Sequence, residues 1–174
     1  MKDILAAASI IVLEQYGLSK VVVGFGFDGT LAAIVDDRRT SAMRRSTREA
    51  LWSVAKLYPC AVISGRARKD VQARLDGIDL RAVVGSEEMP PGDSDKGRVL
   101  LDLVAREGAH AAIYVGDDAT DEAAFALRSP PVLGIRVGKN PASAARYFVR
   151  DQGRVDGLLA RLVAIRAGGR YRDR

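Results

Sequence analysis

The chain has 174 residues, of which 48% are hydrophobic and 28% are charged, and a formal net charge of +5. This length fits one domain with a full core, and the composition is ordinary for a globular protein. The single cysteine, Cys60, excludes an internal disulfide and favours a cytoplasmic location. The arginines are dispersed and no nucleic-acid motif is present, so we expect no nucleic-acid partner in spite of the basic charge.

The first segment is an apolar run over residues 4–13, which predicts a helix. The run is too short to span a bilayer, and Asp3 together with the missing cleavage site argues against a signal peptide. We therefore assign residues 1–18 to an N-terminal apolar helix that packs on the domain or on another subunit. This helix is the candidate contact for a homo-oligomer, and we expect no membrane partner.

From residue 19 onward the sequence alternates between strand and helix patterns. Short apolar runs predict strands at residues 20–25, 61–64, 81–84, 111–115, 132–137 and 147–149. Helical patterns occupy residues 47–57, 69–75, 97–107, 121–126 and 155–165. The alternation predicts an α/β fold over residues 19–166, a three-layer Rossmann-like arrangement with a mostly parallel sheet. Residues 167–174, with two glycines among arginines, are predicted to form a flexible basic tail.

Polar residues follow several of the predicted strands, where open α/β sheets bind their ligands. They are Asp28, Gly29 and Thr30 after the first strand of the domain, Ser64, Gly65 and Arg66 after the second, Lys96 at a helix start, and Asp117, Asp118, Asp121 and Glu122 after the fourth. Hydroxyl and amide groups can hold phosphate oxygens, lysine at a helix start can neutralise them, and carboxylates suit Mg²⁺. Taken alone, each residue also has a simpler explanation: a turn, a solvated surface position or a helix cap.

Together these segments resemble the haloacid dehalogenase superfamily of phosphatases, and the string over residues 116–122 looks most like the trehalose-6-phosphate phosphatase branch. The resemblance implies magnesium-dependent hydrolysis of a phosphomonoester, with a phosphorylated sugar as the ligand. It implies that Asp28 acts as general acid and base and that Lys96 neutralises the phosphoryl group. By the same resemblance, phosphate is bound by Gly29, Thr30, Ser64, Gly65, Arg66 and Lys96, and Mg²⁺ by Asp28, Asp117, Asp118 and Asp121.

Two departures from the family's pattern bear on activity. The family places its nucleophilic aspartate two residues before Asp28, and Gly26 stands there in this chain. The family's cap domain is inserted between the serine and lysine motifs, where this chain has only the short connection over residues 87–95, so we expect a capless core. Losing a covalent nucleophile costs roughly 10⁶ in turnover in a well-studied hydrolase. The sequence thus predicts an impaired phosphatase.

Three alternatives remain open. The chain could be a non-catalytic phosphosugar-binding or regulatory module, a pseudophosphatase. Asp28 could instead activate water directly, without a covalent step. The glycine pattern over residues 24–29 also matches the dinucleotide-binding fingerprint, although a helix should begin within that pattern and the sequence there predicts a turn. The single histidine, His110, excludes a multi-histidine metal site.

Overall fold

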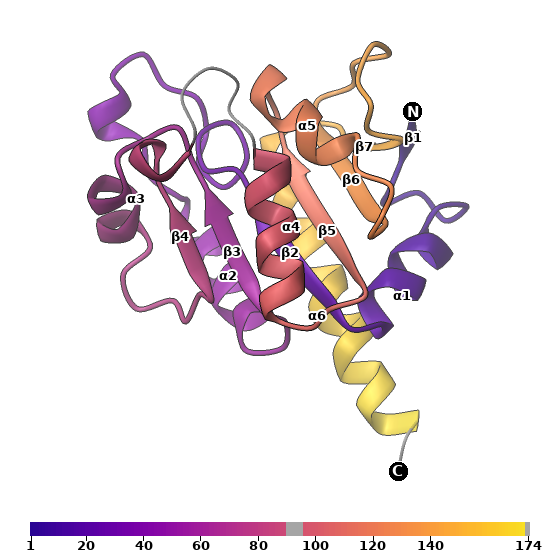
Figure 1. Ribbon diagram of the computed structural model, residues 1–174. Coiled ribbons are helices and arrows are strands. Elements are labelled where there is room, and N and C mark those ends of the chain that lie inside the picture. The colour runs from indigo at the N-terminus through magenta and orange to yellow at the C-terminus, as the bar shows by residue number, and fades with distance from the viewer. Residues whose placement is uncertain (90–95, 173–174) are drawn as a thin grey trace.

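A seven-stranded sheet forms the centre of the protein, and every pair of neighbouring strands in it is parallel (Figure 1). The computed structural model describes residues 1–89 and 96–172. The strands are β1 (Lys2–Asp3), β2 (Val21–Phe25), β3 (Cys60–Ile63), β4 (Ala82–Val84), β5 (Ala111–Gly116), β6 (Val132–Val137) and β7 (Tyr147–Val149). Their order across the sheet is β1-β7-β6-β5-β2-β3-β4. The predicted parallel α/β architecture is confirmed.

Helices cover both faces of this sheet. One apolar cluster lies between the sheet and the helices α1 (Ile10–Leu18), α2 (Arg45–Ala55), α3 (Arg68–Arg74) and α6 (Val155–Arg172). A second cluster lies under α4 (Lys96–Arg106) and α5 (Glu122–Phe125). In Figure 1, α4 crosses in front of the sheet and α6 lies behind it. Strand β2 shows why both layers are needed, since Val21 and Val23 enter the first cluster and Val22 enters the second.

The N-terminal segment differs from the single helix expected over residues 1–18. Helix α1 begins only at Ile10, and β1 pairs with β7 at the sheet edge. The carboxylate of Asp3 accepts the backbone N–H of Leu5 at 2.9 Å, a local bond that competes with helix formation. Ile4 is fully buried, so this segment is part of the core. Ile11 and Leu18 on α1 are exposed, and a homo-oligomer contact through them stays a prediction.

The C-terminal end also differs from expectation. Helix α6 continues to Arg172, so the predicted flexible tail is helical from residue 167 to 172, while residues 173–174 lie outside the described part. Leu158, Leu159 and Leu162 anchor the first turns of α6 in the core, and an established helix adds further residues at low cost. Of the connection predicted over residues 87–95, positions 90–95 lie outside the described residues. None of the helices within the described ranges is long and apolar enough to cross a membrane.

The glycine pattern over residues 24–29 does not open a helix. After β2 the chain forms turns and an isolated bridge between Asp28 and Ala32, and the next α-helix begins at Arg45. A dinucleotide site needs a helix N-terminus directly behind its glycines, because that terminus binds the pyrophosphate. The structure therefore contradicts the dinucleotide-binding alternative.

The strand order fixes where a ligand site is expected. From β2 the chain first adds β3 and β4 on one side and then returns to add β5, β6 and β7 on the other. Strand β2 is thus the point where the direction of winding changes, and ligands of open α/β sheets bind at the carboxyl ends of strands at such a point.

Candidate functional site

A cavity of about 150 Å³ lies at the carboxyl ends of β2, β3 and β5. It is lined by Gly26, Phe27, Asp28, Arg38, Ser64, Gly65, Met89, Lys96, Asp118 and Thr120. The lining comes from loops that are far apart in the sequence, and it brings together most of the residues that the sequence singled out. Among those residues, Gly29, Thr30, Arg66, Asp117 and Asp121 do not line the cavity; they lie behind its wall, in contact with residues that do or with one another.

Gly26 occupies the wall of this cavity in an ordinary backbone conformation. Its N–H donates to the carbonyl of Val115 at 2.9 Å, which fixes the end of β2 beside β5. A β-carbon built at Gly26 would lie 3.2 Å from the hydroxyl oxygen of Thr30 and 3.9 Å from a carboxylate oxygen of Asp121. A side chain therefore fits here after a shift of a few tenths of an ångström, and glycine is not required by the fold.

Asp28 lies at the cavity edge, with its carboxylate bound to Arg66. The Arg66 Nε and Nη2 atoms each donate to it at 2.7 Å, and the Ser41 hydroxyl donates at 3.0 Å. A second guanidinium, that of Arg38, lies 3.4 Å away. Burial raises the pKa of Asp28, but the hydrogen bonds from Arg66, Ser41 and Arg38 outweigh burial and bring the pKa below its usual value. Asp28 is therefore held as a charged hydrogen-bond acceptor.

A buried ion pair between Lys96 and Asp121 lies beneath the cavity. The Lys96 Nζ atom is 2.8 Å from a carboxylate oxygen of Asp121, whose side chain is completely buried. The Tyr114 hydroxyl donates to the same oxygen at 2.8 Å. The backbone N–H groups of Asp117 and Asp118 donate to the other oxygen at 2.9 and 3.1 Å. All of these donors are needed because a buried carboxylate without partners is strongly unfavourable.

Asp117 is the carboxylate with the fewest partners in the site. The Thr30 hydroxyl donates to it at 3.0 Å, and a β-carbon on Gly29 would overlap its carboxylate. Gly29 adopts a φ of 76°, which also favours glycine. Burial raises the pKa of Asp117 to about 6; the Thr30 hydrogen bond opposes this shift, and the negative charges of Asp121 and Asp118 add to it. The positive charge of Lys96 also opposes the shift, but Asp117 forms no salt bridge in the described residues, whereas Asp28 and Asp121 each do.

Ser64 and Asp118 orient backbone groups around the cavity. The Ser64 hydroxyl is almost fully buried and accepts the backbone N–H of Arg66 at 3.2 Å, which shapes the turn through Gly65. The Asp118 carboxylate accepts the N–H and the hydroxyl of Thr120 at 2.8 and 2.5 Å, and so caps the short turn that precedes α5. The cap explanation weighed for this motif thus applies to Asp118.

The four predicted magnesium ligands are not assembled around one point. In residues 1–89 and 96–172, no group of three or more His, Cys, Asp or Glu side chains is placed to hold a metal ion. Asp121 is saturated by Lys96, Tyr114 and two backbone N–H groups, and Asp28 is bound by Arg66. Among the four, Asp117 and the half-exposed Asp118 keep capacity for a cation. The side chains as arranged therefore do not fit a magnesium ion.

The sequence reasoning missed Arg38, Tyr114 and the partnership between Arg66 and Asp28. Arg38 lines the cavity from a loop that carries no motif. Tyr114 looked like an ordinary core residue of β5, and its hydroxyl nevertheless donates to Asp121. The position of Tyr114 seven residues before a carboxylate gives no sequence signal, because the contact depends on the turn between them.

The comparisons with known proteins agree with this geometry. A scan against models of protein families finds no match. The chain is 41% identical over 70 residues to probable trehalose-phosphate phosphatase G of Arabidopsis thaliana, covering 40% of this chain and 18% of that protein. It is 35% identical over 133 residues to probable trehalose-phosphate phosphatase 3 of Oryza sativa subsp. japonica, covering 72% of this chain and 34% of that protein. The matches thus span about a third or less of these relatives' length.

Solved structures share the fold at lower identity. The trehalose-6-phosphate phosphatase of Aspergillus fumigatus superposes with a TM-score of 0.75 at 14% identity, over 94% of this chain and 99% of that chain. The 3-deoxy-D-manno-octulosonate 8-phosphate phosphatase of Moraxella catarrhalis, solved with magnesium, phosphate and the sugar, gives 0.71 at 18% identity over 92% and 95% of the two chains. The chain therefore has the fold of haloacid dehalogenase-type phosphatases and is related over part of its length to trehalose-phosphate phosphatases.

Proposed function

We propose that this chain binds phosphomonoesters, phosphorylated sugars in particular, in the cavity beside Gly26 and that its hydrolytic step is impaired. The single observation that carries the proposal is glycine at the wall of a cavity whose other parts suit a phosphoryl group. Lys96 and Arg38 supply positive charge, and the loop over residues 64–66 supplies a buried hydroxyl. The partial relationship to trehalose-phosphate phosphatases supports a sugar phosphate as the ligand.

The impairment follows from what the cavity lacks. Phosphoryl transfer needs an attacking group in line with the leaving oxygen, and glycine offers none. Asp28 is a poor replacement, because its bond to Arg66 fixes its charge and its pKa lies below the usual value. A general base works best with a pKa near the operating pH. The alternative in which Asp28 activates water directly is therefore disfavoured.

Magnesium is expected to matter only once an aspartate stands at position 26, and the missing cap is expected of the chain as it is. Because the described carboxylates do not fit a metal as arranged, no step of the proposed binding depends on one. An aspartate at position 26 would add a carboxylate beside Thr30 and Asp121, and so add a ligand as well as a nucleophile. We also propose that the core is capless, which would leave the cavity open to larger phosphate esters.

The substitution Gly26→Asp tests the proposal directly. We expect phosphate release from 4-nitrophenyl phosphate and trehalose 6-phosphate, assayed with magnesium, to rise by roughly 10³ or more over the unaltered chain, because the missing nucleophile is restored. Gly26→Asn is the matched control, since it adds a side chain of the same shape that cannot attack phosphorus. It should stay at the level of the unaltered chain.

Two results would contradict the proposal separately. A folded Gly26→Asp protein with no more activity than Gly26→Asn would remove the claim that glycine limits hydrolysis. Calorimetry that detects no binding of inorganic phosphate or trehalose 6-phosphate to the unaltered chain would remove the claim that the cavity binds phosphoryl groups.

A further inference from the structure

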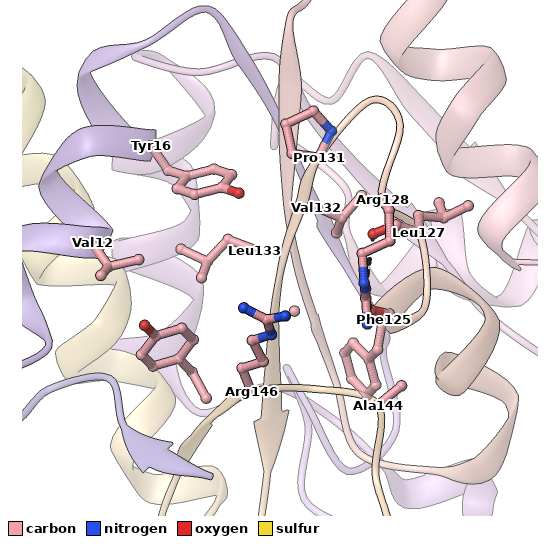
Figure 2. Close-up of a pocket in the computed structure, with 12 residues that line it drawn as sticks. Val12, Tyr16, Phe125, Leu127, Arg128, Pro131, Val132, Leu133, Ala144 and Arg146 are labelled. Carbon is pink, nitrogen blue, oxygen red and sulfur yellow. Dashed lines mark hydrogen bonds between the residues drawn. The ribbon is translucent and has the colours of Figure 1, made fainter.

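A second cavity lies at the edge of β6, away from the carboxyl-end site. Strand β7 pairs with β6 only over Ile135–Val137, so the first half of β6, residues 132–134, is not covered by β7. A pocket of about 280 Å³ occupies this place and is shown in Figure 2. We call it the β6 notch. It is lined by Val12, Tyr16, Phe125, Leu127, Arg128, Pro131, Val132, Leu133, Gly134, Ala144, Arg146 and Tyr147.

The walls of the β6 notch combine polar groups with apolar side chains, and the apolar side chains come from both faces of the sheet. Val12 and Leu133 belong to the cluster under α1 and α6, whereas Phe125 and Ala144 belong to the cluster under α4 and α5. The notch exists because β7 is too short to separate these two clusters along the whole of β6. Its volume is close to the lower end of small-molecule sites, about 300 Å³.

Two arginines give the β6 notch a positive charge. The lining residues include Arg128 and Arg146 and no aspartate or glutamate. The guanidinium of Arg128 is fixed, since its Nη1 atom donates to the carbonyls of Phe125 and Leu127 at 2.8 and 3.0 Å. The carbonyl of Arg146 accepts the N–H of Lys2 at 3.0 Å, but its side chain makes no hydrogen bond or ion pair with any residue in the described ranges. In Figure 2 its guanidinium lies between the side of the notch that carries Leu133 and the side that carries Phe125.

Further donors converge on the same space. The phenol of Tyr16 points into the notch in Figure 2, and Tyr147 lines it as well. Burial and the neighbouring Tyr147 raise the pKa of Tyr16, with Arg146 opposing, so its hydroxyl stays protonated at neutral pH. The carbonyl of Pro131 accepts from Ala112 on β5, so by alternation the backbone N–H groups of residues 132 and 134 face away from β5, toward the notch.

We propose that the β6 notch binds a small organic anion with an apolar, ring-sized body, such as an aromatic carboxylate. The apolar walls suit the body, and the fork of Arg146 matches a carboxylate in two parallel hydrogen bonds. The positive lining disfavours cations. The site is distinct from the candidate phosphate cavity and does not depend on the proposed function.

Calorimetry on the full chain tests this proposal with three probes: benzoate, benzyl alcohol and inorganic phosphate. Benzyl alcohol keeps the ring without the charge, and phosphate keeps the charge without the ring. We expect benzoate to bind at concentrations up to about 10 mM and to bind at least about tenfold more tightly than benzyl alcohol. The heat of phosphate binding should be the same in the unaltered chain and in variants with substitutions in the β6 notch.

Two variants and a control locate the binding. Arg146→Gln removes the unpaired guanidinium and should weaken benzoate binding by about tenfold or more. Ala144→Phe keeps both arginines and fills the notch, and should abolish binding. Arg150→Gln makes the same charge change at an exposed arginine outside the notch and should leave benzoate affinity unchanged. Melting curves check that each variant is folded.

Three outcomes would overturn the proposal. One is the absence of benzoate binding by the unaltered chain. Another is benzyl alcohol binding as tightly as benzoate, which would show that the arginines play no part. The third is unchanged benzoate binding in Ala144→Phe or in a folded Arg146→Gln protein, which would place the ligand elsewhere.

Discussion

The carboxylate of Asp28 faces two guanidinium groups, and Arg66 holds it through two hydrogen bonds of 2.7 Å. The Arg66 side chain is only 6% exposed and also donates to Asp70 at 2.8 Å. Arg66 further donates to the carbonyl of Arg38 at 2.7 Å, so this group joins the loop after β2 to the start of α3. At the scale of single residues, Asp28 thus has a structural role in addition to any role toward a ligand.

Replacing Asp28 by asparagine should destabilise the protein by about 2 kcal/mol, because a nearly buried guanidinium loses one of its two carboxylate partners. Urea unfolding monitored by circular dichroism measures the change. Asp36→Asn is the matched control, since Asp36 is exposed in the same loop and should change the free energy of unfolding by less than about 0.5 kcal/mol. Equal stability of the two variants would show that the Arg66 pair contributes little.

At this scale the sequence predicted which residues lie at the cavity, but not which side chains they bond to. Asp28, Ser64 and Lys96 do line one cavity, because the ends of neighbouring parallel strands meet at one edge of the sheet. The sequence could not show that Asp121 is fully buried with Lys96 and Tyr114, since those contacts depend on how α4 packs over β5. The predicted magnesium ligands stay a prediction, since the described residues hold no ready group of three metal-binding side chains.

At the scale of elements, Asp156 joins the start of α6 to the start of α2. Its carboxylate accepts from the hydroxyls of Ser46 and Thr47 at 2.7 and 2.5 Å and lies 3.1 Å from the guanidinium of Arg44. Burial raises the pKa of Asp156, but the hydrogen bonds from Thr47, Ser46 and Arg44 outweigh it and lower the pKa below its usual value. Asp156 thus ties α6 to side chains at the first turn of α2, a helix without a side-chain cap of its own.

Asp156→Asn should lower the free energy of unfolding at pH 7 by about 1 kcal/mol, since the carboxylate is a quarter exposed and its contribution is partly screened. A folded-state pKa below the unfolded value means that this stability is present above the unfolded pKa and is lost as pH falls through the folded pKa. The difference between the variant and the unaltered chain should therefore shrink below about pH 4. Urea unfolding at several pH values measures it.

The control for this experiment is Glu49→Gln on α2, the helix that Asp156 contacts. Glu49 pairs with Arg45 at 2.8 Å on an exposed surface and should contribute less than about 0.5 kcal/mol. If the loss in Asp156→Asn were the same at pH 3 and pH 7, the ionised carboxylate would not be its cause.

The elements that the sequence predicted least well are the terminal ones. Strand β1 has two residues and no apolar pattern of its own, and its pairing with β7 depends on a chain segment almost 150 residues away. The extension of α6 past residue 167 runs against the low helix propensity of its two glycines. The other strands were predicted within one or two residues because each is a short apolar run, and β2, β3 and β5 are buried along their whole length.

At the scale of the whole molecule, Cys60 reports on the integrity of the core. It begins β3 in the larger apolar cluster and is fully buried, and burial raises the pKa of its thiol well above the usual value. We expect Ellman's reagent to label Cys60 only as the protein unfolds, with the labelled fraction following the urea transition. An exposed reference thiol, Ala105→Cys on α4, should react at once in the native protein. Fast labelling of Cys60 without denaturant would show that the sheet opens locally.

The parallel sheet and its two helical layers could be predicted because local pattern and global fold agree along most of the chain. The β6 notch could not, because it results from a difference in length between two neighbouring strands. Sequence patterns locate the ends of strands only to within a few residues. The notch depends on β7 being three residues shorter than β6, which is within that uncertainty.

Gly29 needs its unusual backbone angle of 76°, whereas Gly26 has no positive φ and a β-carbon there needs only a small shift of Thr30. Glycine at position 26 therefore changes the charge of the crevice and leaves its shape almost untouched. With one carboxylate fewer, Lys96 and Arg38 face less competing negative charge, so a doubly charged phosphate group can be accommodated without a divalent counter-ion. A protein of this kind would retain its ligand in the presence of a chelator, conditions under which a magnesium-dependent relative would release it.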